Sequence, residues 1–271
     1  MPRSIPTLCG SLAGQPFTFN VKVHNAAYRA LGVDYTFISF GVEDVAGAIA
    51  AIRTFGIRGM NVTMPHKQAV IPYLDALDET ASAINAVNTI NQVDGRLTGY
   101  NTDCIGAVKA LEEATPLAGR KIALLGAGGA ARAIAWGMRR AGAQLTVFNR
   151  TAERGAALAQ DFGVAFGGTL GEFDPARFDG LVNATAAGFR APDVNPLAPH
   201  QLAPHLFVMD VAFIPVRTKL VRDAAALGCR TVDGTRMLLH QFCGQIELYT
   251  GMRAPFDVMS QALLDEIARV G

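Results

Sequence analysis

Hydrophobic positions in the first hundred residues alternate between two spacings, which predicts strands and helices in turn. The run Val33–Phe40 is rich in β-branched and aromatic residues and predicts a strand. In Val42–Phe55, hydrophobic side chains recur every three or four residues, as on one face of an amphipathic helix. Arg58–Met64 predicts another strand, ended by Pro65, which has no amide hydrogen for a sheet ladder. This order indicates an α/β fold.

A hairpin is predicted around Asp94–Gly95, a pair suited to a two-residue turn of type I′. Strands paired about this turn place Asn88 opposite Asn101. Two residues further out, Ala86 would face Asp103. The open end of the hairpin would therefore gather several polar side chains.

From Arg120 onwards strands and helices alternate, with a glycine-rich turn after the first strand. Five segments there have the composition of strands: Lys121–Leu125, Gln144–Phe148, Gly180–Ala184, Leu206–Ala212 and Cys229–Val232. Repeated βα units predict a parallel sheet covered by helices on both faces. The residues from Met237 on are expected to be helices without strand partners. We predict two α/β domains: a substrate domain, 1–104 completed by helices of 238–271, and a Rossmann dinucleotide-binding domain, 105–237.

Composition and charge argue against several other classes of protein. Half of the 271 residues are hydrophobic and 17% are charged, as in folded globular proteins. The 24 Lys and Arg nearly balance the 23 Asp and Glu, without a block of like charge, so we expect no nucleic-acid partner. No apolar run reaches the ~20 residues of a membrane span. The first 14 residues predict a strand and loop and not a signal peptide.

We therefore expect a cytoplasmic protein with no membrane partner. The four cysteines, which are Cys9, Cys104, Cys229 and Cys243, lack CxxC spacing and have no histidine at ligand spacing. No metal site is expected, and the cysteines are interpreted as buried reduced thiols.

A dinucleotide site is predicted at a glycine-rich segment that follows a strand and opens a helix. The segment fits the G-x-G-x-x-A pattern. Gly126 would allow the tight turn, Gly128 the close approach of a pyrophosphate, and the small Ala131 the close packing of helix on strand. The alternative is a turn with a packing role only. The residues of this turn expected to contact the cofactor are Gly126, Ala127, Gly128, Gly129 and Ala130.

The end of the following strand indicates which dinucleotide binds. An NAD site usually has Asp or Glu there, to accept hydrogen bonds from the ribose 2′-hydroxyl. This chain has Asn149, Arg150 and Thr151 instead, with Arg154 one turn later. Guanidinium groups suit a 2′-phosphate, which a carboxylate would repel. We predict NADP as the cofactor; the alternative is a solvated helix start.

Two motifs in the first half resemble signatures of a known family. They are NVTMPHK at 61–67 and GYNTDCIG at 99–106, which closely resemble the NVTxPxK and GxNTDxxG signatures of shikimate dehydrogenases. The resemblance covers nearly the whole chain. It includes Ala86–Thr89, the glycine-rich turn, Asn149–Thr151, Asn183–Gly188 and Gly234–Gln241.

The resemblance implies an NADP-dependent enzyme that interconverts 3-dehydroshikimate and shikimate, with Lys67 and Asp103 as the catalytic pair. The chemistry is consistent, since a protonated lysine can stabilise alkoxide charge and deliver a proton. Taken alone, Lys67 would be a surface residue and Asp103 a helix N-cap, and His66 is an alternative acid–base group. The resemblance also implies substrate contacts at Thr18, Asn20, Thr63, Asn88, Asn101 and Gln241, and cofactor contacts at Ala184, Val211 and Gly234.

The chain departs from the family pattern where the acid group of the substrate is held. Family members commonly carry Ser-x-Ser-Pro before a His-Asn pair, and both hydroxyls hold the carboxylate. Here Thr18 and Asn20 stand at those positions, and Phe213 replaces a usual Tyr. A lost charge-assisted hydrogen bond is worth ~1.5–3 kcal/mol, or roughly one to two decades in affinity or rate. We therefore expect slow turnover of shikimate or an altered substrate preference.

Two rival functions remain. One is a dehydrogenase for quinate or an aminated shikimate analogue, and the other is a catalytically silent NADP- or metabolite-binding protein. Intact Lys67 and Asp103 argue against the second, because a binding protein needs no proton donor. The expected partner is a small, shikimate-like ring carboxylic acid, and both a monomer and a homodimer are compatible with the sequence.

Overall fold

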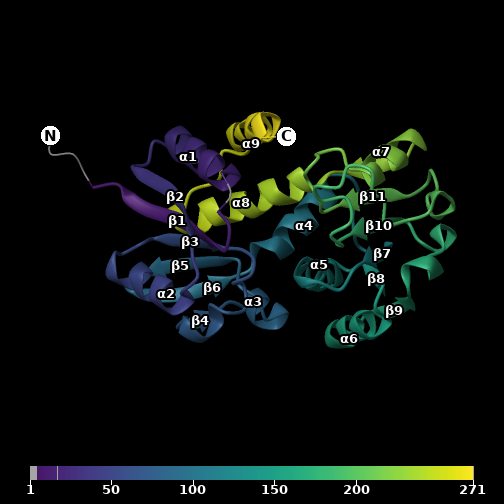
Figure 1. Ribbon diagram of the computed structural model, residues 1–271, viewed down its shortest axis with the longest axis horizontal. Coiled ribbons are helices and arrows are strands. Elements are labelled where there is room, and N and C mark those ends of the chain that lie inside the picture. Colours follow the sequence, from purple (N-terminus) through teal and green to yellow (C-terminus); the bar gives the residue numbers. More distant parts are fainter. Residues whose placement is uncertain (1–4, 17, 271) are drawn as a thin grey trace. The chain divides into compact units, whose positions relative to one another are not determined.

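The computed structural model describes residues 5–16 and 18–270, and the chain divides into two compact units (Figure 1). Unit 1 comprises the residues up to Thr102 together with Gln241–Val270, and unit 2 comprises Asp103–His240. No helix in the described part of the chain has both the length and the hydropathy needed to cross a membrane.

Unit 1 is built on a six-stranded mixed sheet with strand order β2-β1-β3-β5-β6-β4. Strand β5 runs antiparallel to both β3 and β6, whereas β1 is parallel to β2 and β3. The strands are β1 (Thr7–Ala13), β2 (Tyr35–Gly41), β3 (Gly59–Val62), β4 (Ala76–Leu77), β5 (Thr89–Val93) and β6 (Arg96–Tyr100). The helices are α1 (Phe19–Leu31), α2 (Val45–Thr54), α3 (Glu79–Ile84), α9 (Phe256–Val270) and, from Gln241 on, α8 (Gly234–Thr250).

The two faces of the unit 1 sheet are covered by different helices, as the alternation along β3 shows. Met60 belongs to a buried cluster that includes Ile49 of α2. The neighbouring Gly59 faces α8, where a Cβ would lie 2.2 Å from the Tyr249 ring. The Tyr249 hydroxyl also donates a hydrogen bond to Asn61 Oδ1 (2.7 Å). Helix α9 lies beside α1 (Figure 1), so the final helices complete the core of unit 1.

The hairpin β5–β6 has the predicted register. Val93 pairs with Arg96, and the turn residues Asp94–Gly95 have φ values of 50° and 79°, as a type I′ turn requires. One residue beyond the other end of this ladder, Asn88 and Asn101 stand opposite each other. The predicted pairing of Asn88 with Asn101 is therefore confirmed. The predicted pairing of Ala86 with Asp103 is wrong, because a helix begins at Thr102 and ends the hairpin there.

Unit 2 is built on a six-stranded parallel sheet with strand order β12-β11-β10-β7-β8-β9. The strands are β7 (Lys121–Leu125), β8 (Gln144–Phe148), β9 (Ala165–Gly168), β10 (Gly180–Asn183), β11 (Phe207–Asp210) and β12 (Arg230–Val232). The α-helices are α4 (Thr102–Glu112, from Asp103 on), α5 (Gly129–Arg140), α6 (Ala152–Phe162), α7 (Lys219–Ala226) and the start of α8. Short 3₁₀ helices occur at Ile71–Tyr73 in unit 1 and at Leu170–Glu172, Pro175–Arg177 and Pro199–Gln201 in unit 2.

The central strand β7 of the unit 2 sheet is buried on both faces, as expected for repeated βα units. Along β7, Ile122 and Leu124 join a cluster that includes residues of α4, α5 and α6. The alternate residues, Ala123 and Leu125, join a second cluster with Leu220 of α7 on the opposite face. Every residue of β7 after its first is therefore apolar and buried.

The strand order creates a switch point beside β7. From β7 the chain moves outward through β8 and β9, and then returns to the other side of β7 for β10, β11 and β12. Loops that leave the carboxyl ends of β7 and β10 therefore diverge, and ligands of parallel α/β sheets bind where such loops diverge. The glycine-rich segment that follows β7 lies at this edge of the sheet.

Candidate active site

The glycine-rich turn between β7 and α5 has the geometry that a dinucleotide needs. Gly126 has a φ of 110° and donates its N–H to Phe148 O (2.8 Å). A Cβ added at Gly126 would lie 3.0 Å from Ala184 O, which is too close for an ordinary contact. At Gly128 and Gly129 an added Cβ would meet only open space, and both residues are exposed. The N–H groups at the start of α5 are thus accessible to a phosphate. Ala131 is fully buried against the sheet, as the motif requires.

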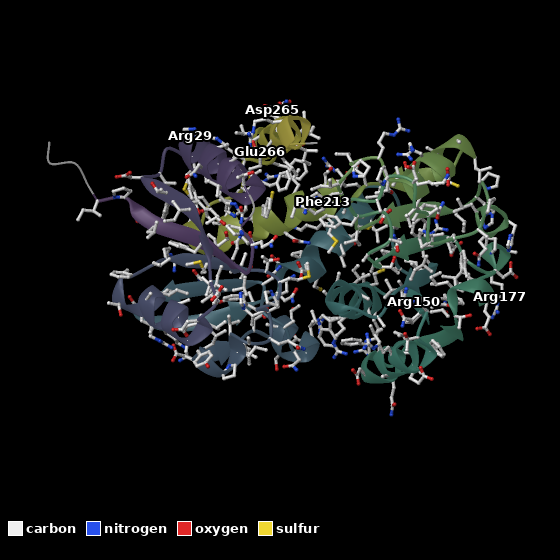
Figure 2. The ribbon with its side chains drawn as sticks, in the orientation of Figure 1. Arg29, Arg150, Arg177, Phe213, Asp265 and Glu266 are labelled. Carbon is white, nitrogen blue, oxygen red and sulfur yellow. The ribbon has the colours of Figure 1, made fainter. Side chains whose placement is uncertain are left out.

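The predicted ribose-phosphate residues follow the next strand, β8. Asn149 donates its N–H to Gly168 O (3.1 Å) and its side-chain amide to Thr151 O (2.7 Å), which fixes the start of the loop before α6. Arg150 and Arg154 are both exposed, and Figure 2 labels Arg150. The two arginines are four residues apart in the sequence, in the segment that follows the carboxyl end of β8.

The other predicted cofactor residues also follow strand ends at this edge. Ala184 donates its N–H to Leu125 O (2.8 Å), and Val211 donates its N–H to Asn183 O (2.9 Å). A Cβ at Gly234 would lie 2.4 Å from Val211 O, so only glycine fits there. Phe213, at the position where the family usually has Tyr, lies against Phe189 with ring centroids 5.7 Å apart.

A buried carboxyl group holds the loops after β10 and β11. Asp210 is fully buried and accepts hydrogen bonds from Asn183 Nδ2 (2.9 Å), Thr218 Oγ1 (2.6 Å) and Ala212 N (3.1 Å). Burial raises the pKa of Asp210 from 3.8 to about 6, although these three hydrogen bonds act in the opposite direction.

Asp210 should make the stability of the protein depend on pH. Its pKa is higher in the folded than in the unfolded chain, so its stabilising contribution is complete below 3.8 and is lost as the pH rises through about 6. The free energy of unfolding is measured in urea for wild type and Asp210→Asn. Between about pH 4 and pH 7, the difference between the two proteins should shift by about 2–3 kcal/mol in favour of the variant. Asp193→Asn, which changes an exposed carboxylate, is the control, and parallel pH profiles for wild type and Asp210→Asn would contradict this role.

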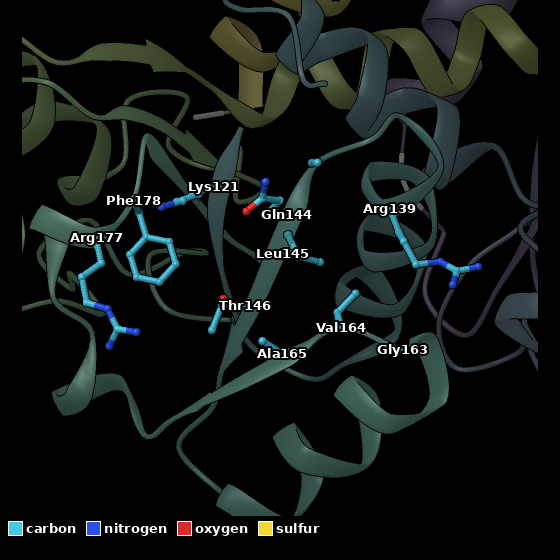
Figure 3. Close-up of a pocket in the computed structure, with 11 residues that line it drawn as sticks. Lys121, Arg139, Gln144, Leu145, Thr146, Gly163, Val164, Ala165, Arg177 and Phe178 are labelled. Atoms are coloured by element: carbon cyan, nitrogen blue, oxygen red, sulfur yellow. The ribbon is translucent and has the colours of Figure 1, made fainter. Parts of the chain in front are cut away.

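A groove of about 520 Å³ lies at the opposite edge of the unit 2 sheet (Figure 3). It is lined by Lys121 and Gln144, which begin β7 and β8, and by Arg139 and Arg177. Because the glycine-rich turn follows the carboxyl end of β7, this groove is not the candidate dinucleotide site. Among the residues that the structure describes, no cluster of His, Cys, Asp and Glu is arranged to hold a metal ion.

In unit 1 the chain brings several predicted substrate and catalytic residues to one edge of the sheet. The carbonyl of Lys67 accepts the N–H of Val87 (2.8 Å), the residue before Asn88. Asn101 donates its side-chain amide to Ala86 O (2.9 Å). Lys67 itself is half-buried.

Asn88 is the centre of a hydrogen-bond network at this edge. Its Oδ1 accepts from the N–H of Thr102 (2.7 Å) and the hydroxyl of Thr89 (2.8 Å), and Gln245 Nε2 donates to the same Thr89 hydroxyl (3.1 Å). Thr102 begins α4, so Asp103 is the second residue of that helix and is not its N-cap. Asp103 is only 5% exposed, a burial that a surface cap would not show.

The remaining predicted residues of unit 1 lie on three elements. Thr63 follows β3, where its N–H donates to Leu12 O (3.1 Å), and half-buried Gln241 lies one turn before Gln245 on α8. Thr18 and Asn20 lie at the start of α1. His66, the alternative acid–base group, is 7% exposed, which favours Lys67 as the accessible residue of the motif.

Two residues near these positions had no clear signal in the sequence. Gln245 donates to Thr89 in the network around Asn88, and only its place one turn after Gln241 points to it. The other is Glu266, whose carboxylate accepts a hydrogen bond from Thr18 Oγ1 (2.5 Å). It lies in an amphipathic helix, where a glutamate would be expected in solvent.

Three segments of the chain match descriptions of one protein family. Residues 16–90 match the shikimate dehydrogenase substrate binding domain, residues 108–187 match shikimate/quinate 5-dehydrogenase, and residues 234–264 match the shikimate 5′-dehydrogenase C-terminal domain. Shikimate dehydrogenase (NADP(+)) of Pyrococcus abyssi is 40% identical over 263 residues, which is 95% of this chain and 98% of that protein.

Solved structures of similar proteins have the same fold. Shikimate 5-dehydrogenase of Thermus thermophilus, in complex with NADP(H) and shikimate, has a TM-score of 0.88 and 32% identity over 95% of this chain and 98% of that one. The ligand-free 5-ketofructose reductase of a Gluconobacter species has a TM-score of 0.91 and 33% identity over 97% of this chain and 99% of that one.

Proposed function

Since the chain belongs to the shikimate dehydrogenase family, we propose that it is an NADP-dependent oxidoreductase that interconverts 3-dehydroshikimate and shikimate. The observation that carries the proposal is the combination of the open glycine-rich turn, followed by Arg150 and Arg154, with the Lys67 and Asp103 motifs in one chain. Unit 2 would bind the cofactor and unit 1 the ring. A cytoplasmic protein that acts as a monomer or homodimer fits this role.

Unit 2 offers a suitable surface for NADP. The exposed N–H groups from Gly128 and Gly129 would hold the diphosphate, and the open space above both glycines fits that role. Arg150 and Arg154 would pair with the 2′-phosphate. When bound, NADPH supplies the hydride. The remaining residues proposed to line this site are Gly126, Ala127, Ala130, Asn149, Thr151, Ala184, Val211 and Gly234.

Lys67 is proposed to act on the oxygen of the carbonyl group. As this carbon is reduced, its oxygen gains negative charge, which the Lys67 ammonium would stabilise before it delivers a proton from Nζ. In the reverse direction the neutral amine would accept the hydroxyl proton. Asp103, as the carboxylate of the pair, would orient the ammonium group.

The substrate would lie against the polar edge of unit 1. Asn88 and Asn101 are held there by the hairpin and its network, and Thr63 and Gln241 are the further proposed contacts. Thr18 and Asn20 would meet the substituent that is a carboxylate in shikimate. A relative of comparable structural similarity is named for a sugar ketone, so the scaffold is not restricted to one ring.

The experiment is an assay of NADPH oxidation with 3-dehydroshikimate, and of NADP⁺ reduction with shikimate. We expect turnover in both directions and much weaker activity with NADH or NAD⁺. Purified, folded protein that neither binds a nicotinamide nucleotide nor turns over in either direction would overturn the proposal.

A further inference from the structure

We propose that Glu266 is a specificity-determining residue. It accepts the hydrogen of the Thr18 hydroxyl, and the site formed by Thr18 and Asn20 therefore prefers an uncharged hydrogen-bonding substituent of the substrate to a carboxylate. The inference rests on the proposed function, because it takes Thr18 and Asn20 as the contacts of the ring substituent. It adds a substrate class to that function, namely ring ketones and alcohols without an acid group at this position.

The Thr18 hydroxyl is already committed as a donor. Its Oγ1 donates to Glu266 Oε1 at 2.5 Å. Thr18 occupies the N-cap position of α1, where a threonine usually accepts a hydrogen bond from an N–H of the first turn, and here the side chain makes no such bond. A hydroxyl has one hydrogen, so Thr18 can only accept from any additional partner.

The partner of Thr18 is a charged and sheltered carboxylate. Glu266 is 4% exposed, and Arg269 on the same helix donates to both of its oxygens (2.7 and 2.9 Å). The hydrogen bonds from Arg269, followed by that from Thr18, lower the pKa of Glu266 to about 2, and the charge of Lys22 acts in the same direction. Figure 2 shows Glu266 on α9. A second carboxylate at Thr18 would therefore meet a fixed negative charge that Arg269 already pairs with.

Asn20 offers the opposite capacity. Its Oδ1 accepts the N–H of Val21 (2.9 Å), so the group that it presents to a ligand is Nδ2, which only donates. Thr18 and Asn20 together thus present an acceptor and a donor two residues apart. A hydroxyl or a primary amide can satisfy both, whereas a carboxylate can only accept and would leave the Thr18 oxygen facing a lone pair.

The test compares shikimate with its primary amide, which keeps the ring and its hydroxyls and removes the charge. kcat/KM with NADP⁺ is measured for wild type and for Glu266→Gln. For wild type we expect the amide to be preferred by about tenfold. For Glu266→Gln, kcat/KM for shikimate should rise about tenfold, mainly through a lower KM, and kcat/KM for the amide should change by less than about threefold.

Asp265→Asn is the matched control, because it removes a carboxylate from the adjacent, exposed position of α9 (Figure 2) and should leave both substrates unchanged. Thr18→Val is a second variant, for use also if Glu266→Gln does not fold. It removes the accepting oxygen, and so it should weaken the amide about tenfold and shikimate much less.

The outcomes distinguish a failure of this inference from a failure of the proposed dehydrogenase function. The role of Glu266 would be overturned if wild type had equal kcat/KM for shikimate and the amide, and if neither Glu266→Gln nor Thr18→Val changed these values. The dehydrogenase proposal would then remain intact. An absence of NADP⁺ reduction with both compounds in folded wild type would count against the proposed function itself.

Discussion

Replacement of Lys67 by alanine should lower kcat for 3-dehydroshikimate reduction by a factor of about 10²–10⁴, which is the usual contribution of a positioned acid–base group. KM for NADPH should change by no more than about threefold, because the proposed cofactor contacts belong to unit 2 and Lys67 belongs to unit 1. Steady-state rates of NADPH oxidation at saturating concentrations of both substrates measure the effect.

Lys109→Ala provides the control for Lys67→Ala, since Lys109 is exposed on α4 and has no proposed role. Its kinetics should match wild type. A Lys67→Ala enzyme that is folded and keeps kcat close to that of wild type would exclude Lys67 as the proton donor. Asp103→Asn should give a smaller loss of kcat, because the amine itself would remain.

The double change Arg150→Ala/Arg154→Ala should raise KM for NADPH by about 10²-fold or more and leave KM for NADH nearly unchanged. Each charge-assisted hydrogen bond to a 2′-phosphate is worth about 1.5–3 kcal/mol, and each such amount is about one to two decades in affinity. The ratio of kcat/KM for the two nucleotides is the measured quantity, and it should collapse towards one.

Arg177→Ala is the matched control for the arginine pair. Arg177 is exposed in the same unit, but it lines the groove at the amino edge of the sheet and not the turn beside β8 (Figure 3). It should leave the preference for NADPH intact. If the double change weakened NADPH and NADH equally, these arginines would not recognise the 2′-phosphate.

Features set by local chemistry could be predicted from the sequence. Strands β7 and β8 have the expected bounds. In β7 the reason is that a parallel strand buried on both faces is a nearly continuous apolar run. The Asp94–Gly95 turn, with both φ values positive, fixed the register of the hairpin and so the place of Asn88. The turn at Gly126 was recognisable because the spacing of its small residues has a steric cause.

Features set by distant contacts could not be predicted. The hydrophobic pattern did not reveal α1, a helix that carries the buried His24 and packs against α9. Burial lowers the pKa of His24 to about 4, so this ring behaves as an apolar core group although its residue type suggests the surface. Glu266 meets Thr18 across 248 residues, and no local spacing encodes that contact. The pairing of β5 with β3 also depends on the assembled sheet.

The Tyr249 ring over Gly59 has a consequence for the order in which the protein acquires its structure on the ribosome. Unit 2 is one continuous stretch, so all of its strands are available as soon as His240 has been synthesised. The sheet of unit 1 begins at Thr7, but the face of that sheet at Gly59 is covered by the ring of Tyr249, 190 residues later in the chain. This face therefore stays exposed to water until Tyr249 has been synthesised. The segment translated first is thus completed last, and the inserted nucleotide-binding fold has time to form before it.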